Sequence, residues 1–539
     1  MQLKREHSCD VLVFGSGIAG VSAALDAAET GRTVTLACKG KLFSGSSFYP
    51  GTWGLGLIGA TNEADVDDLA ATIQAVGCGM ADAAIVNNFV KGISPAIEKV
   101  RNMGVKLRRA DNGSEKEYIP CFDHKHRDWN GIEFDSARTV FSQRLAELDV
   151  TVFPNCEALE LVKVDGRVCG AVVSEGNTLR YLGCKSVVLA TGGYGSIFKY
   201  HLCTEDVEGI GQYLALEAGC RLINMEFMQM MPGYVSPAYQ TIFNEKTFRF
   251  TELRRPDGTL LLAKELASLL DVRSTHGPFT SRLPSKAVDI AMFRAFLEDE
   301  HGVEATYTKE MRHNPPEFVK NYFNWLRETH GLTMDDSIRI GIFAHAANGG
   351  IKIDTSAFTG VPGLFAAGEI TGGMHGADRI GGLSTANGLV FGGKAGRSAA
   401  AACAGIPDAP ETVHFEAMAA TGYVDAMHTL QGTMFRHAMV ERDKFGLTTA
   451  LNTVTSLNHN LAASPSNDAR SIAQTRRLKA RLHTAECVLQ AALLRKESRG
   501  AHYRADYPAQ DSDQAAPIVV EKNSGKIYAH FSKEEPICP

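Results

Sequence analysis

The segment that most constrains the fold lies near the N-terminus, where a short apolar run leads into a glycine-rich turn. Residues 10–14 read DVLVF, as expected of a parallel strand buried on both faces. Gly15, Gly17 and Gly20 follow in GxGxxG spacing, and residues 21–37 read as a helix and a second strand. The glycines permit a tight turn, close approach of a pyrophosphate and close helix packing. The pattern predicts a dinucleotide-binding domain with phosphates at the helix N-terminus.

Length, charge and composition narrow the class of protein. A chain of 539 residues, 44% of them apolar and 22% charged, predicts two to four compact domains. A net charge of -6 argues against nucleic acid as a partner. No apolar run is long enough to predict direct membrane insertion, and the first residues lack the apolar region of a signal peptide. We therefore expect a cytoplasmic protein.

The cysteines give no sign of a metal centre. Twelve are scattered along the chain without a CxxC pair, which argues against zinc or an iron–sulfur cluster bound by this chain. We expect most of them to be buried small hydrophobic residues, and we predict no metal ligands.

The remaining pattern alternates between strands and helices. The following segments are predicted: helices at 65–105, a β-meander at 150–190, a charged insertion at about 232–345, a buried strand at 363–369, a helix from about Leu389, helices at 410–500, and a strand or tail over the last thirty residues.

Several motifs in one order resemble the flavoprotein family of succinate dehydrogenases, fumarate reductases and L-aspartate oxidases. They are Lys39 to Tyr49, Ala190-Thr191-Gly192-Gly193, Met225-Glu226-Phe227-Met228-Gln229, His345 to Ile351, Gly368-Glu369, His375 to Arg379, and Arg495 to Arg504. The resemblance covers nearly the whole chain. It implies an α/β fold in which a Rossmann-like FAD-binding domain is interrupted by an α+β capping domain and followed by a helical domain.

That fold implies domain boundaries and a set of FAD contacts. The expected boundaries are 1–231 and 346–408 for the FAD-binding domain, 232–345 for the cap, 409–515 for the helical domain and 516–539 for a tail. The expected FAD-binding residues are Gly15, Gly17, Ala19, Gly20, Lys39, Gly40, Ser46, Ser47, Gly51, Thr191, Gly192, Gly193, Glu369 and Ser384. No histidine occurs between Lys39 and Leu57, so FAD is expected to be held non-covalently.

The resemblance also implies the substrate-side residues. Hydride transfer at flavin N5 needs a substrate that is held close and polarised. In the family a histidine and an arginine do this, and they match His345 and Arg379. The family's proton-donating arginine is replaced by Ser285, which leaves Lys286 and Arg282 as candidate donors.

These departures weaken the assignment of fumarate or aspartate as substrate. Met231 stands where the family has a histidine, and neither Met nor Ser offers a charge to a dicarboxylate. We expect an FAD-dependent oxidoreductase that acts on a carbon next to a carboxylate or carbonyl, with a small-molecule substrate other than fumarate. Two alternatives stay open: an L-aspartate oxidase-like enzyme, and an electron-transfer protein working with an iron–sulfur partner.

Overall fold

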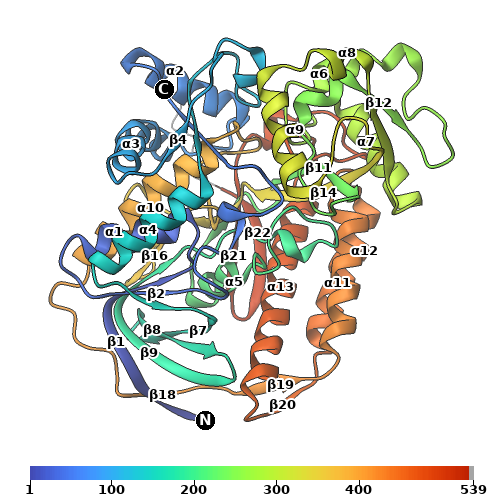
Figure 1. Ribbon diagram of the computed structural model, residues 1–539. Coiled ribbons are helices and arrows are strands. Elements are labelled where there is room, and N and C mark those ends of the chain that lie inside the picture. Colours follow the sequence, from blue (N-terminus) through green and yellow to red (C-terminus); the bar gives the residue numbers. More distant parts are fainter. Residues whose placement is uncertain (533–539) are drawn as a thin grey trace.

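The computed structural model describes residues 1–532, and its centre is a sheet of eight strands (Figure 1). The order is β6-β2-β1-β9-β8-β7, with β16 beside β9 and β18 beside β1. Its strands are β1 Gln2–Phe14, β2 Val34–Ala37, β6 Thr151–Phe153, β7 Cys156–Val164, β8 Arg167–Glu175, β9 Thr178–Leu189, β16 Leu364–Ala366 and β18 Thr412–His414. The pairs β1–β2, β1–β9, β2–β6 and β9–β16 are parallel, whereas β7, β8 and the first half of β9 form the antiparallel meander.

The strand that opens the chain is longer than its apolar run. Residues 11–14 are fully buried, as the sequence pattern predicts, but β1 begins at Gln2. The extra length exists because residues 2–4 pair with β18, which lies some four hundred residues later in the sequence. No local pattern encodes such a partner.

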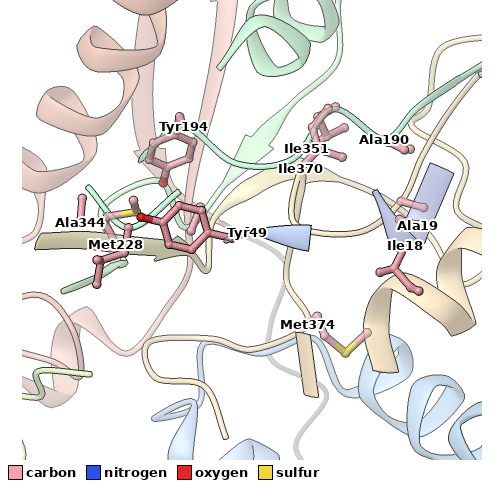
Figure 2. Packing of buried hydrophobic residues seen from close by; sticks show 14 of the residues in the cluster. Ile18, Ala19, Tyr49, Ala190, Tyr194, Met228, Ala344, Ile351, Ile370 and Met374 are labelled. Atoms are coloured by element: carbon pink, nitrogen blue, oxygen red, sulfur yellow. The ribbon is translucent and has the colours of Figure 1, made fainter. Parts of the chain in front are cut away.

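Two helices pack unusually closely above this sheet. The helices of the region are α1 Ile18–Ala28, α2 Glu63–Val76, α3 Ala83–Asn102, α4 Phe134–Glu147, α5 Ile210–Ala218 and α10 Leu383–Ala401. Gly388, Gly392 and Gly396 recur on one face of α10, and a Cβ on any of them would lie within 2.5 Å of an atom of α1. Figure 2 labels Ile18 and Ala19 of α1 together with Ala190, which follows β9, in the same apolar cluster.

In the sequence, the capping region lies between two long strands that pair with each other antiparallel. Its sheet has the order β11-β14-β13-β12. The elements are β11 Met228–Ser236, β12 Thr251–Arg254, α6 Leu269–Arg273, α7 Lys286–Glu298, β13 Val303–Tyr307, α8 Lys309–His313, α9 Glu317–His330 and β14 Ile338–Ala347. Figure 1 shows these elements, in green and yellow, at one end of the molecule.

Two smaller sheets join distant parts of the chain. The first has the order β17-β15-β10-β21-β22 and the second β3-β5-β4. Their strands are β10 Leu222–Ile223, β15 Gly350–Lys352, β17 Thr371–Gly372, β21 Ile518–Asn523, β22 Lys526–Phe531, β3 Leu55–Gly59, β4 Leu107–Arg108 and β5 Asp128–Ile132. Residues 518–531 thus form a hairpin that pairs with β10, rather than a free tail.

The helical region that follows consists of α11 Tyr423–Ala438, α12 Lys444–His459 and α13 Ala469–Leu494, with the short strands β19 Met418–Ala420 and β20 Ala463–Pro465. The predicted helix start at Leu389 is wrong, because α10 begins at Leu383, directly after Gly382 with a φ of 82°. Among residues 1–532, no helix has the length and hydropathy needed to cross a bilayer.

Candidate functional site

One large cavity connects the GxGxxG turn with the capping region. Its volume is about 340 Å³, and its lining comes from β1, α1, the loop after β2, β14, the loop before α10 and the cap. The N-termini of α1 and α10 both open onto it, because Gly15 to Ala19 and Gly381 to Thr385 line the wall. Two helix N-termini provide unpaired N–H groups and a favourable field for an anion.

Ten of the predicted cofactor residues line this cavity. They are Gly15, Gly17, Ala19, Lys39, Ser46, Ser47, Thr191, Gly192, Glu369 and Ser384. Gly17 caps α1 without a side-chain hydrogen bond of its own. The Ile18 N–H donates to Ser47 Oγ at 3.1 Å, which leaves the next N–H groups of the first turn to a ligand. The Oγ of Ser46 and the Oγ1 of Thr191 are buried and have no partner in the described structure. Buried hydroxyls without partners, in the same cavity as two helix N-termini, fit the phosphates and hydroxyls of a dinucleotide.

The other four predicted cofactor residues do not line the cavity themselves but lie next to residues that do. A Cβ on Gly20 would lie 1.8 Å from the Gly15 carbonyl oxygen, and one on Gly193 would lie 2.5 Å from the Glu369 carboxylate. The carbonyl of Gly40 accepts a hydrogen bond from Asn155, and that of Gly51 accepts one from Ile242. These glycines set the spacing of the backbone and are not part of the cavity lining.

Lys39 stands where many dinucleotide folds carry an acidic residue, and here its charge is paired within the protein. Its ammonium forms ion pairs with Glu208 and, at 3.9 Å, with Glu157. Glu157 also lines the cavity, so a carboxylate does reach this end of the site from β7. Glu157 lies in the meander on β7, far from the end of β2, where dinucleotide folds usually carry the acidic residue, so no sequence pattern marks it.

Arg379 is the buried cation at the cap end of the cavity. Its exposed fraction is 9%, and its Nε donates to the side-chain carbonyl oxygen of Gln229 at 2.9 Å. That single bond orients the guanidinium, whose terminal nitrogens have no hydrogen-bond partner in the described part of the chain. Burial lowers the pKa of Arg379, and Glu369 opposes this. A buried guanidinium with free donors is suited to a carboxylate.

His345 lies near the end of β14, and Glu369 follows β16. Burial, followed by the charge of Arg379, lowers the pKa of His345 to about 3, so its imidazole is neutral at pH 7. Its Nδ1 has no partner in the described structure, and the residue lines the cavity. Glu369 accepts the Ala347 N–H at 3.0 Å, and burial raises its pKa. The structure therefore brings His345, Arg379 and Glu369 together at one cavity.

Lys286 and Arg282 are not brought into this cavity. Lys286 lies at the start of α7, where its Nζ donates to the Ser281 carbonyl at 3.3 Å. Arg282 donates to Asp378 at 2.7 Å. Their roles as proton donors stay predictions. Ser285, at the position of the family's arginine, is fully buried and lies 2.9 Å from His276 Nε2.

The cap end contains two polar residues that the sequence analysis missed. Cys121 and Glu245 both line the cavity, and the Cys121 thiol donates to Glu245 Oε1 at 2.9 Å. Met231, expected as a pocket wall, also lines it. No sequence signal marks Cys121, which lies in a loop, or Glu245, which opens a short 3-10 helix, because only folding brings the two residues to the site.

Comparison with known proteins agrees with this geometry. The family model described as an FAD binding domain matches residues 10–385, and the fumarate reductase flavoprotein C-terminal model matches residues 427–529. The L-aspartate oxidase of Yersinia pestis is 28% identical over 556 residues, which cover 96% of this chain and 100% of that protein. A subunit of the fumarate reductase (CoM/CoB) of Methanothermobacter marburgensis is 26% identical, with 96% of this chain and 97% of that protein covered.

Solved structures share the fold. Mycobacterium smegmatis Sdh1 in complex with UQ1 superposes with a TM-score of 0.80 at 24% identity, covering 100% of this chain and 96% of that one. A quinol-fumarate reductase with menaquinol superposes with a TM-score of 0.79 at 20% identity, covering 98% of each chain. The Rossmann-like fold with a cap and a helical domain is confirmed. This chain is an FAD-dependent oxidoreductase and belongs to the flavoprotein family of succinate dehydrogenases, fumarate reductases and L-aspartate oxidases.

Proposed function

We propose that the chain oxidises or reduces a C–C bond next to a single carboxylate or carbonyl. Bound FAD supplies hydride acceptance or donation at its N5 atom. The main support is Arg379, a buried guanidinium that lines the cavity together with His345 and whose terminal nitrogens have no hydrogen-bond partner among the described residues. Arg379 would hold the carboxylate, and the neutral imidazole of His345 would add a hydrogen bond to the same group or to an adjacent carbonyl.

The lining argues for one anionic group rather than two. Lys39 and Arg379 are the lysine and arginine in the described cavity lining, and Lys39 lies at the nucleotide end, paired with Glu208. At the cap end Met231 stands where a dicarboxylate site of this family has a histidine. A second carboxylate there would meet an apolar side chain and the Glu245 carboxyl group, which is unfavourable. The proposed substrate is therefore a monocarboxylate or its carbonyl analogue, and fumarate is a poor one.

An anaerobic stopped-flow screen tests this assignment. The flavin is reduced with dithionite and mixed with crotonate, cinnamate, fumarate or maleate, while its absorbance reports reoxidation. We expect crotonate or cinnamate to reoxidise the flavin at least about ten times faster than fumarate, because each carries one carboxylate. Preference for fumarate would contradict the proposal.

An L-aspartate oxidase-like activity is the second candidate, because L-aspartate oxidases are among the similar proteins. The cap end has Ser285 bonded to His276 and Met231 in the wall, so it lacks two polar groups that a small amino dicarboxylate would use. Hydrogen peroxide formed from L-aspartate in air would favour this candidate.

Two further parts of the proposal concern how the flavin is held and how it exchanges electrons. We propose non-covalent FAD, because the loop from Lys39 to Leu57 offers no histidine for a bond. Acid precipitation should leave the pellet colourless. The similar protein of Methanothermobacter marburgensis is one subunit of a fumarate reductase, which supports an electron-transfer partner for this chain. Co-purification of an iron–sulfur protein from a cytoplasmic fraction would support that arrangement.

A further inference from the structure

Cys121 lies where three separate segments meet at the cap end of the cavity. It belongs to the loop before β5, and it faces Gly277 of the cap and Gly381 of the loop before α10. A Cβ placed on Gly277 would be 3.4 Å from the Cys121 sulfur, and one on Gly381 would be 3.7 Å from it. The Gly381 N–H also donates to the Cys121 carbonyl at 3.1 Å. The thiol is therefore fixed between the cap and the FAD-binding domain.

The neighbours of the thiol favour its protonated form. Its Sγ donates to Glu245 Oε1 at 2.9 Å, and Glu245 comes from the cap segment after β11. Burial, followed by the charge of Glu245, raises the pKa of Cys121 to about 12. A thiol in this setting is a poor nucleophile but carries a proton at neutral pH.

Two other protic groups near the cap end, those of Ser285 and Asp378, are engaged elsewhere. Ser285 is fully buried against His276, whose Nδ1 donates to the Pro278 carbonyl at 2.7 Å, so the serine hydroxyl donates to Nε2. Asp378 is held by Thr280 and Arg282, each at 2.7 Å. Neither Ser285 nor Asp378 lines the cavity. Cys121 and Glu245 do.

The loop that carries Cys121 is anchored by the residues that follow the thiol. Arg127, whose side chain is fully buried, forms ion pairs with Asp123 at 2.9 Å, with Asp68 at 2.7 Å and with Asp65. The side chain of Phe122, the residue after Cys121, stacks on the imidazole of His276, with 5.2 Å between the two ring centroids. Ser285 therefore has a positioning role through His276 and Phe122, in place of the arginine that its position has in the family.

We propose that the thiol of Cys121 is the acid that protonates the substrate carbon, with Glu245 as the carboxyl group that restores its proton. This assignment rests on the proposed function. In the reducing direction, one alkene carbon receives a hydride from the reduced flavin, and the other carbon forms a C–H bond as the Cys121 S–H bond breaks. The thiolate left behind regains a proton from water by way of Glu245. Oxidation runs through the same steps in reverse.

The test uses the dithionite-reduced holoenzyme with crotonate as acceptor, and ferricyanide as an acceptor that needs no proton transfer to carbon. We compare the wild type with Cys121→Ala, Cys121→Ser, Glu245→Gln and the control Cys169→Ala. Cys169 is a buried cysteine of β8 outside the cavity. Reoxidation by crotonate should fall about 10²–10⁴-fold in Cys121→Ala and at least about tenfold in Glu245→Gln. FAD content and the ferricyanide rate should not change.

Two signatures distinguish an acid from a packing residue. The solvent deuterium isotope effect of the crotonate reaction should change in Cys121→Ser, which keeps the size of the side chain but not the thiol. The infrared S–H stretching band assigned by Cys121→Ser should move when crotonate binds the oxidised enzyme and when Glu245 becomes Gln.

The outcomes separate this inference from the proposed function. A crotonate rate within about threefold of the wild type in Cys121→Ala overturns the role of the thiol. If neither crotonate nor cinnamate reoxidises the wild-type flavin, the proposed function fails. The infrared S–H band in Glu245→Gln then still shows whether the Cys121 thiol is bonded to Glu245. An S–H band that neither crotonate nor Glu245→Gln shifts overturns the Cys121–Glu245 pair.

Discussion

The two ends of the cavity are built in different ways. At the nucleotide end the wall is mostly backbone, formed by the turn through Gly15 and Gly17 and by the loop at Ser46 and Ser47. At the cap end the wall is made of side chains from distant segments, among them Cys121, Glu245 and Arg379. Backbone sites tolerate little change at a few glycines, whereas side-chain sites can be remodelled one residue at a time.

That difference explains where this chain departs from its relatives. The nucleotide end must hold the same cofactor as in the relatives, so the spacing of its glycines stays the same. We expect the cap end to decide the substrate, and by the family motifs Ser285 and Met231 stand in place of an arginine and a histidine. Variants at the two ends of the cavity test this difference between a backbone site and a side-chain site.

The largest effect is expected for Gly20→Ala at the nucleotide end. The new Cβ would lie 1.8 Å from the Gly15 carbonyl, which forces α1 away from the turn. We expect loss of bound FAD and of at least about 3 kcal/mol of stability, measured by flavin absorbance and urea unfolding.

The matched control is Gly432→Ala in α11, where a Cβ would meet nothing within 4 Å. It should retain FAD and gain up to about 1 kcal/mol. Equal FAD content in the Gly20 variant and this control would refute the backbone account of the nucleotide end.

Arg379→Met should have the next largest effect and act at the cap end alone. Loss of the buried guanidinium should lower kcat/KM for an active carboxylate about 10²–10³-fold, because the carboxylate loses a charge-assisted hydrogen bond in a buried site. FAD content should stay normal, because Arg379 bonds Gln229 and not the turn of α1. Unchanged turnover would remove Arg379 from the substrate site.

A smaller effect is expected for Lys286→Met and Arg282→Met. Neither side chain lines the cavity, and each already has a protein partner, the Ser281 carbonyl or Asp378. Flavin reoxidation by crotonate should change less than about threefold in each. A loss above about tenfold in Lys286→Met alone would assign it the proton-donor role and weaken that of Cys121.

The smallest effect concerns the pH dependence of stability at Asp378. Burial raises the pKa of this carboxyl to about 6, against which Arg282 acts. Because the folded-state pKa lies above the unfolded value, its contribution is fully present below about pH 4 and is lost as the pH rises through about 6.

Asp378→Asn removes this titration, so the free energy of unfolding in urea should vary less between about pH 4 and pH 7 than in the wild type. Gly432→Ala serves for comparison, since it neither adds nor removes a titrating group and should leave that slope at its wild-type value. An unchanged slope in Asp378→Asn would show that other groups set the pH dependence.

The sequence by itself determined the fold class, the glycine turn, the order of domains and the presence of FAD. The buried strand and the glycine turn follow from local rules: apolar runs make buried strands, and glycines at fixed spacing admit a pyrophosphate and a close helix. The order of domains and FAD came from the resemblance of several motifs to a known family. The motifs around His345 and Arg379 also predicted that both residues belong to one site, and the structure does place both in one cavity.

Only the tertiary structure decided what surrounds those motifs. Cys121 reached the cavity because the anchor at Arg127 and the stack of Phe122 on His276 fix its loop, and both depend on residues far away in the sequence. The length of β1 and the hairpin of β21 and β22 also depend on partners hundreds of residues distant. Contacts between segments so far apart leave no periodic trace in either one, so the sequence could not place them.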